Sequence, residues 1–219
     1  MTYPAAPWHL KGYAVQTLQL VDIDKASKFI PSELEIVSLL PGKTLGSIYI
    51  SCYESGSLLT YNELIAAPGL VRYQGKIGGW ISHIYVDNLD SVAGGREIWG
   101  LPKEMADFSW NNGSVSVSQN NRELCSLSYQ KSFLNLSTWW QQELSAGCFG
   151  GLGSELLFFD NNFKTQVALL QGKLEIPQYS PFASLNLDKP LFTLNLQKLE
   201  LMAGVPKVVG EKAPELSYS

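Results

Sequence analysis

The chain has 219 residues, of which 45% are hydrophobic and 16% are charged, and its formal net charge at pH 7 is -4. This apolar content is high enough to build a packed core, so the composition excludes a disordered chain. The acidic balance, together with the absence of a Lys/Arg cluster in the sequence, excludes a nucleic-acid footprint, and we expect no nucleic-acid partner.

The charged fraction is low against the roughly 25% that is usual for soluble domains. Because the cores of protein interfaces are depleted of charged residues, we expect a homo-oligomer. No apolar run approaches the roughly 20 residues that a membrane helix needs, and the first residues lack the basic-then-apolar order of a signal peptide. We therefore predict no membrane partner and a cytoplasmic location.

Three cysteines are odd in number and widely spaced, which favours a reducing compartment over a disulfide framework. The two histidines, His9 and His83, have no metal-ligand spacing with the cysteines. The sequence thus predicts neither a metal site nor a cofactor. The cysteines are Cys52, Cys125 and Cys148.

The first third of the chain alternates between strand-like and turn-like segments. Residues 1–9 are proline-rich and are predicted to form a mobile arm, and a strand is predicted over residues 10–20. Asp22 or Asp24 can cap a short helix that ends at Pro31. The period-two pattern of residues 45–53 predicts a strand, which a turn at 54–57 joins to a second strand over 58–66. The apolar residues at helical spacing are Ile23, Ala26, Phe29 and Ile30.

Glu63 shares one face of the second strand with apolar neighbours, because side chains alternate along a strand. Burying an unpaired carboxylate costs several kcal/mol, on the order of magnitude known for such groups, so Glu63 must find a cation, find hydrogen-bond donors or keep its proton. The alternative is that this face is solvated, or that Glu63 pairs with a structural arginine such as Arg72. The neighbours are Leu59, Tyr61 and Ile65.

The remaining elements also read as strands and turns. We predict a turn at 75–79, a strand at 80–88, a sharp bend at Gly94-Gly95, and a hairpin of 113–119 with 123–129 around Asn120-Asn121. Residues 147–153 are glycine-rich but lack the Lys-Ser/Thr ending of a phosphate loop, so a flexible loop is predicted. Strands follow at 167–176 and 191–199, and a mobile tail at 204–219. Nothing divides the chain, so we expect one domain, 1–219, a mostly antiparallel barrel or sandwich with one or two short helices.

Residues 94–107 hold the best candidate for chemistry. Lys103 follows Leu101-Pro102 and has Trp99 and Trp110 nearby in sequence, which makes an apolar wall around its amine plausible. An unprotonated lysine amine condenses with a ketone or aldehyde to an imine, whose protonated form withdraws electrons from the adjacent carbon. The alternative is that Arg96 or Glu97 ties down a bend and Lys103 is an ordinary surface lysine.

Residues 84–104, with their Gly-Arg-Glu and Pro-Lys elements, resemble the signature of the acetoacetate decarboxylase family, and residues 31–36 and 61–64 resemble two further segments of it. The resemblance implies that Lys103 is the Schiff-base lysine and that Glu63 is an active-site glutamate. It implies an α+β, predominantly antiparallel fold, an acetoacetate decarboxylase-like β-barrel with short helices that assembles into oligomers. As substrate-pocket or positioning residues we take Glu104, Arg96, Tyr61, His83 and Trp99.

The sequence also departs from the family pattern. Glu104 stands where the true decarboxylase has a second lysine, and a carboxylate close to Lys103 would favour the ammonium form. The family's second pocket glutamate falls near Ile48, and its substrate-facing arginine falls near Gly12, with Lys11 beside it. A pocket without that arginine has no cation to hold a substrate carboxylate, so acetoacetate is not the expected substrate.

Two functions remain open at this point. The first is a Schiff-base lyase that acts through Lys103 on a keto acid or a related apolar keto compound, with decarboxylation, aldol cleavage and dehydration as candidate outcomes. The second is a non-catalytic pocket protein that binds a hydrophobic small molecule, with Glu63 and Lys103 as a polar anchor pair.

Overall fold

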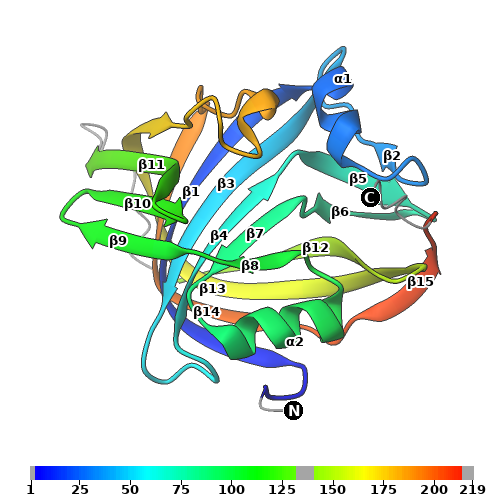
Figure 1. The fold of residues 1–219 in the computed structure, drawn as a ribbon, viewed down its shortest axis with the longest axis horizontal. Coiled ribbons are helices and arrows are strands. Elements are labelled where there is room, and N and C mark those ends of the chain that lie inside the picture. The colour runs from blue at the N-terminus through cyan, green and yellow to red at the C-terminus, as the bar shows by residue number, and fades with distance from the viewer. Residues whose placement is uncertain (1–2, 132–140, 214–219) are drawn as a thin grey trace.

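The computed structural model describes residues 3–131 and 141–213, and a single large β-sheet dominates it (Figure 1). The sheet has 15 strands. In chain order they are β1 (Trp8–Asp22), β2 (Glu35–Ile36), β3 (Lys43–Tyr53), β4 (Tyr61–Ala67), β5 (Gly69–Tyr73), β6 (Lys76–Trp80), β7 (His83–Val86), β8 (Lys103–Met105), β9 (Asp107–Asn111), β10 (Ser114–Gln119), β11 (Arg122–Lys131), β12 (Gln142–Leu152), β13 (Glu155–Glu175), β14 (Phe192–Ala203) and β15 (Lys207–Glu211).

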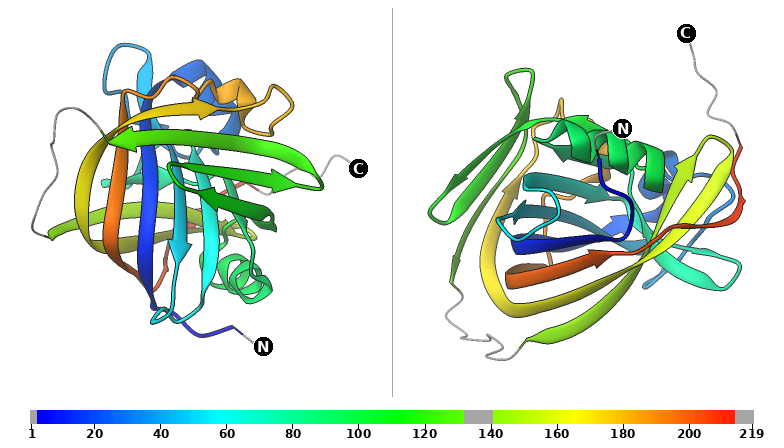
Figure 2. Two further views of the ribbon diagram at one scale, coloured as in Figure 1. Left: turned by 90° about the vertical axis from the view of Figure 1, so that its left-hand side faces the viewer. Right: turned by 90° about the horizontal axis from the view of Figure 1, so that it is seen from below.

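The strand pairing is antiparallel except between β6 and β12 and between β7 and β8, which confirms the predominantly antiparallel prediction. The main path runs β2-β5-β6-β12-β13-β14-β1-β3-β4-β7-β8, and the sheet is strongly curved (Figure 2). β2 and β8 are the strands at the two ends of this path. Among the described residues they do not pair with each other, so the sheet is not closed into the predicted barrel. These end strands have only two and three residues, which leaves short edges.

The helices differ from the prediction. The helix expected after Asp22 is only α1 (Ile23–Ala26), followed by a 3₁₀ turn over Ser27–Phe29, and a second 3₁₀ turn lies at Ala183–Leu185. The longer helix is α2 (Leu89–Trp99), which runs straight through the glycine pair where a bend was predicted. Asn88 caps it by accepting a hydrogen bond from the Ser91 backbone N–H at 3.0 Å, and Gly100 ends it at a φ of 61°. No described helix is long and apolar enough to cross a membrane.

The predicted hairpin around Asn120-Asn121 is confirmed, since β10 and β11 pair directly and both asparagines have positive φ. The loop predicted at 147–153 is wrong, because residues 147–152 belong to β12. Glycine is needed there for close packing, as a Cβ on Gly150 would lie 2.0 Å from the carbonyl oxygen of Trp99. The segments assigned to a mobile arm and tail also contribute to the sheet, through buried Trp8 in β1 and through β15, which pairs with β13.

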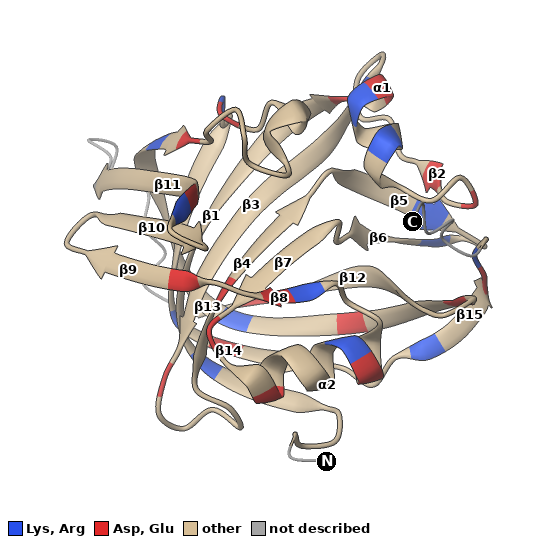
Figure 3. Ribbon diagram, viewed as in Figure 1, with Lys and Arg blue, Asp and Glu red and all other residues tan. Residues whose placement is uncertain are grey.

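Alternating side chains of the central strands supply two apolar clusters. On β3, Ile48 and Ile50 belong to one cluster, whereas Tyr49 and Tyr53 belong to the other. The second cluster surrounds the cavity described below. Lys and Arg are dispersed over separate elements in the view of Figure 3. All three cysteines are free thiols.

Candidate active site

A strand-helix-strand unit positions Lys103. β7 and β8 are parallel neighbours, and such a pair needs a crossover connection, which α2 supplies. Lys103 pairs with Ile84 of β7, which in turn pairs with Ile65 of β4. Because alternate residues share a face, Glu63, two residues before Ile65, lies on the same face as Lys103.

The two residues form a buried ion pair. The Lys103 Nζ donates a hydrogen bond to Glu63 Oε2 at 2.8 Å, and the exposed fractions of the two residues are 3% and 6%. Each charge offsets the cost of burying the other. The alternative partner for Glu63, Arg72, is engaged elsewhere, since its guanidinium pairs with Glu35 at 2.9 Å.

Helix α2 holds the lysine from its other side. The Lys103 Nζ donates a second hydrogen bond, at 2.9 Å, to the Oγ of Ser91 in the first turn of the helix. One turn further, a Cβ on Gly95 would lie 2.4 Å from the Lys103 Cδ, so the lysine stem occupies the space that glycine leaves open. The Arg96 Nε donates to the Lys103 carbonyl oxygen at 2.7 Å. The glycine pair therefore permits a close approach of side chains inside a helix, where a bend was predicted.

Aromatic rings enclose the amine. The Lys103 Nζ lies 5.0 Å from the Tyr61 ring centroid and 5.7 Å from the Trp8 ring centroid, within the range of cation–π contacts. Sequence reasoning missed Trp8, because it follows a proline-rich segment and reads as part of an arm. It also missed Ser91, whose role depends on helix α2.

A chain of tyrosine hydroxyls leads away from the ion pair. The Tyr53 hydroxyl donates to Glu63 Oε1 at 3.3 Å, and the Tyr49 hydroxyl lies 3.3 Å from that of Tyr53. Burial raises the pKa of Tyr49, Tyr53 and Tyr61, so all three stay protonated near neutral pH. The chain can therefore donate hydrogen bonds to the Glu63 carboxylate.

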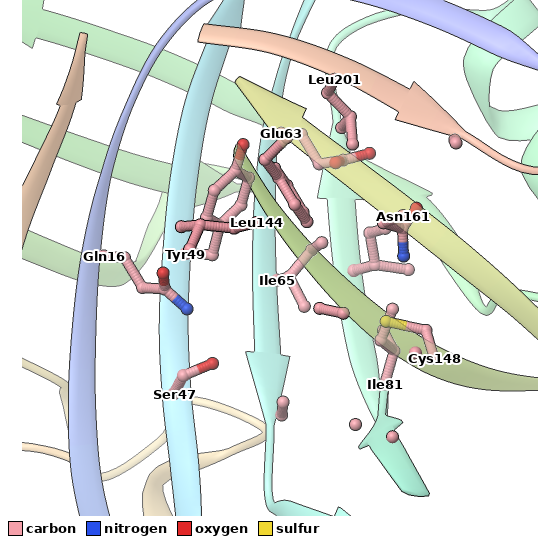
Figure 4. A pocket seen from close by; sticks show the side chains of 18 of the residues that line it. Gln16, Ser47, Tyr49, Glu63, Ile65, Ile81, Leu144, Cys148, Asn161 and Leu201 are labelled. Carbon is pink, nitrogen blue, oxygen red and sulfur yellow. The ribbon is translucent and has the colours of Figure 1, made fainter. Parts of the chain in front are cut away.

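The ion pair faces a cavity of about 640 Å³. Figure 4 shows part of the cavity lining, including Glu63. The lining is mostly apolar, and of the described lining residues only Glu63 and Lys103 are charged. Cys148 lines the cavity wall, where burial raises the pKa of its thiol to about 12. A cavity of this size suits a small molecule with a large apolar part.

The sequence-predicted positioning residues divide into two groups. Tyr61 and Trp99 line the cavity with Lys103. His83 and Arg96 line a neighbouring cavity of about 590 Å³, and Glu104 is exposed and accepts a hydrogen bond from the Gln119 amide at 3.0 Å. His83 immediately precedes Ile84, and Glu104 immediately follows Lys103. Because Ile84 and Lys103 face the cavity, side-chain alternation turns His83 and Glu104 to the other face of the sheet.

The structure also shows where Ile48 and Lys11, two positions that concern departures from the family pattern, lie relative to the cavity. Ile48 is fully buried in the first apolar cluster, away from the cavity, and its neighbours Ser47 and Tyr49 line the cavity instead. Lys11 is exposed and lies 3.6 Å from Glu200. The described lining therefore has no second cation. Among the described residues, no group of three His, Cys, Asp or Glu side chains could hold a metal ion.

This fold, with a buried lysine on the wall of an apolar cavity, defines an acetoacetate decarboxylase-like protein. The acetoacetate decarboxylase of Legionella pneumophila superposes with a TM-score of 0.75 at 19% identity, covering 96% of this chain and 90% of that one. The family model for acetoacetate decarboxylase matches residues 2–142, and the chain belongs to that family.

Curated relatives match over a shorter stretch. Protein NEOXANTHIN-DEFICIENT 1 of Solanum lycopersicum is 33% identical over 107 residues, which is 49% of this chain and 36% of that protein. An acetoacetate decarboxylase of Burkholderia ambifaria is 47% identical over 106 residues, or 48% and 41% of the two chains. The chain thus spans less than half the length of these relatives. The enduracididine biosynthesis enzyme MppR, solved in complex with pyruvate, superposes with a TM-score of 0.68 at 16% identity, covering 95% and 91%.

Proposed function

We propose that the protein is a Schiff-base lyase that forms an imine between Lys103 and a keto acid or a related apolar keto compound. The observation that carries this proposal is the buried Lys103 amine, which lies on the wall of an apolar cavity and 2.8 Å from the Glu63 carboxylate. Membership of the acetoacetate decarboxylase family supports a decarboxylase-like enzyme. Burial of the amine among aromatic rings is the kind of environment in which lysine nucleophiles are found.

The geometry suits the proton transfers of imine formation. The Glu63 carboxylate accepts a proton from the Lys103 ammonium, and the freed lone pair attacks the carbonyl carbon to form a carbinolamine. Glu63 then returns the proton to the carbinolamine oxygen, which leaves as water, and an iminium ion remains. With a β-keto acid, the bond to the carboxylate carbon breaks, carbon dioxide leaves and the electron pair moves to the nitrogen. The resulting enamine takes up a proton at carbon, and water releases the ketone.

The charged residues that line the cavity limit the charge that a substrate can carry. A free carboxylate would need a cation other than the lysine that becomes the imine, and the described lining offers none. The substrate is therefore more apolar than acetoacetate, or its acid group is lost without a charged partner. Aldol cleavage and dehydration use the same iminium ion and fit the same site.

Borohydride trapping tests the imine. Incubation with a panel of apolar ketones and β-keto acids, followed by reduction, is expected to add the reduced ligand to Lys103, as read from intact mass and peptide mapping. The variant Lys103→Met should lose the adduct completely. Lys164→Met is the matched control, because Lys164 is exposed and forms a surface ion pair with Glu143 at 2.9 Å. Turnover of a genuine substrate by Lys103→Met would refute the mechanism.

The variant Lys103→Met also needs a control for folding stability, because it leaves the Glu63 carboxylate buried without a cation. Breaking a buried pair in this way costs about 3–5 kcal/mol of unfolding free energy. The double variant Lys103→Met/Glu63→Gln removes both charges and should recover much of that loss. Its folding, measured by urea denaturation, separates a lost nucleophile from a lost fold.

The second candidate is a non-catalytic pocket protein that binds a hydrophobic small molecule. The observation in its favour is that the two charges of the cavity neutralise each other, so the remaining wall resembles an apolar binding site. Tight binding of apolar ligands by both the native protein and the double variant, without any trapped adduct, would select this function.

A further inference from the structure

The cavity has a second polar region, away from the ion pair. Gln16 of β1 and Ser47 of β3 both line the cavity, and their side chains point into it (Figure 4). Within the described ranges, neither the Gln16 amide nor the Ser47 hydroxyl makes a side-chain hydrogen bond. Polar groups that face an apolar cavity without partners are available to a ligand.

The strand register brings these two side chains together. Gln16 pairs with Tyr49, and Leu18 pairs with Ser47, so Gln16 and Ser47 are diagonal neighbours on one face of the β1–β3 ladder. Diagonal neighbours of this kind lie about 7–8 Å apart at the backbone, within reach of a common ligand group. A hydroxyl or carbonyl between them can bond to both.

The same register gives the separation from the lysine end. Glu63 pairs with Ser51, four residues along β3 from Ser47. At about 3.3 Å per residue, the Ser47 level lies about 13 Å along the strand from the Glu63 level. Gln16 lies two strands from Glu63, about 10 Å across the sheet at the usual strand spacing. Apolar side chains such as Ile65 and Leu196 line the cavity along with these residues.

We propose that the ligand is an elongated, mainly apolar keto compound with an uncharged hydrogen-bonding group at its far end, and that Gln16 is the residue that selects for this group. The inference rests on the proposed reaction at Lys103 and names its substrate class. The far group is uncharged, because the only charges of the described lining are the ion pair itself. A site that hydrogen-bonds a substrate group discriminates against analogues that lack it, since its own polar atoms are then left unpaired.

The test compares methyl ketones of increasing chain length, each with a terminal hydroxyl or a terminal methyl group. Binding is followed by the fluorescence of Trp8 and Trp99, which line the cavity, and imine formation by borohydride trapping. At the chain length that spans the two polar regions, the hydroxyl compound should bind roughly fivefold to tenfold more tightly than its methyl counterpart.

The variants Gln16→Leu and Ser47→Ala should each reduce this preference, and Gln16→Leu should remove most of it. Gln130→Leu is the matched control, because Gln130 is exposed on β11 and its amide donates to Gln171. Equal binding of the paired ketones at every length, or a preference that survives both cavity variants, would overturn the inference. If the hydroxyl compound still binds more tightly but no adduct is trapped, the result supports the role of Gln16 and Ser47 in ligand binding. The same result contradicts imine formation at Lys103.

Discussion

At the scale of single residues, His83 shows how the two faces of one strand differ in chemistry. Its ring lies 5.5 Å from that of Phe29 and 5.7 Å from that of Phe182, and its Nδ1 lies 2.9 Å from the Ser82 Oγ. Burial lowers the pKa of His83, and nearby Glu104 opposes the shift without cancelling it. The neutral ring is therefore the form that the fold prefers.

This preference predicts an acid-sensitive stability. A folded-state pKa below that of the unfolded chain means that the unfolded chain binds the proton more readily as the pH falls through about 6.5. The stability contributed by neutral His83 is present above that pH and is lost below it. Replacing His83 with Gln should flatten the decline of the unfolding free energy between about pH 7 and pH 5, measured by urea denaturation. His9→Gln, at an exposed position, is the control, and equal slopes for both variants would contradict the prediction.

Two residues of the candidate site, Glu63 and Lys103, could be singled out from the sequence. Strand alternation put Glu63 on an apolar face, and the family resemblance put Lys103 in a pocket, and the structure brings their side chains to 2.8 Å. The same reasoning placed His83 and Glu104 beside the lysine, because distance along the chain does not reveal which face a side chain takes. The pairing of β7 with β8 decides that point.

At the scale of elements, α2 acts as a support for the lysine. Ser91 and Gly95 contact the Lys103 side chain, and Arg96 contacts its carbonyl oxygen. The helix was not predicted from the sequence because it contains two adjacent glycines, and each glycine disfavours a helix by about 1 kcal/mol relative to alanine. The reason for glycine lies in tertiary contacts, with Trp8 against Gly94 and Lys103 against Gly95. By contrast, the β10–β11 hairpin depends on local alternation and its Asn-Asn turn, so it was predictable.

Gly95→Ala tests the support directly. The new methyl group would overlap the lysine stem and displace the amine from Glu63, while the gain in helix propensity offsets part of the strain. We expect a change in unfolding free energy within about 1–2 kcal/mol but a drop of about tenfold to a hundredfold in imine trapping, because misplaced groups react poorly. Leu89→Ala, at the exposed first residue of the same helix, is the control. Undiminished trapping in Gly95→Ala would contradict this role for the helix.

At the scale of the whole molecule, the curved sheet surrounds an apolar cavity of about 640 Å³ instead of filling it with side chains. Composition alone indicated a large packed core, and it could not indicate an internal space of this size. The expected assembly into a homo-oligomer remains a prediction, which the mass of the native protein in solution would test.

Filling the cavity should separate binding from folding. Gly79 lines the cavity, and the open space beside it can accept a larger side chain. Gly79→Leu is expected to weaken binding of elongated apolar ketones by about tenfold or more, since one buried leucine side chain corresponds to about 1.5–3 kcal/mol of apolar contact. Thermal denaturation should show an unchanged or slightly higher midpoint. Unaltered ligand binding would mean that the ligand occupies another part of the molecule.

The alternation of β8 separates two functions that adjoin in sequence. Lys103 turns inward to the ion pair, whereas Glu104 turns outward and, with the Met105 carbonyl oxygen, receives the Gln119 amide from β10. These two neighbouring side chains therefore have different partners on opposite faces of the sheet. A charge change at position 104 is expected to alter the contact between β8 and β10, whereas the Lys103 amine donates its hydrogen bonds to Ser91 and Glu63. The outer face of this strand can therefore change without altering the ion pair on its inner face.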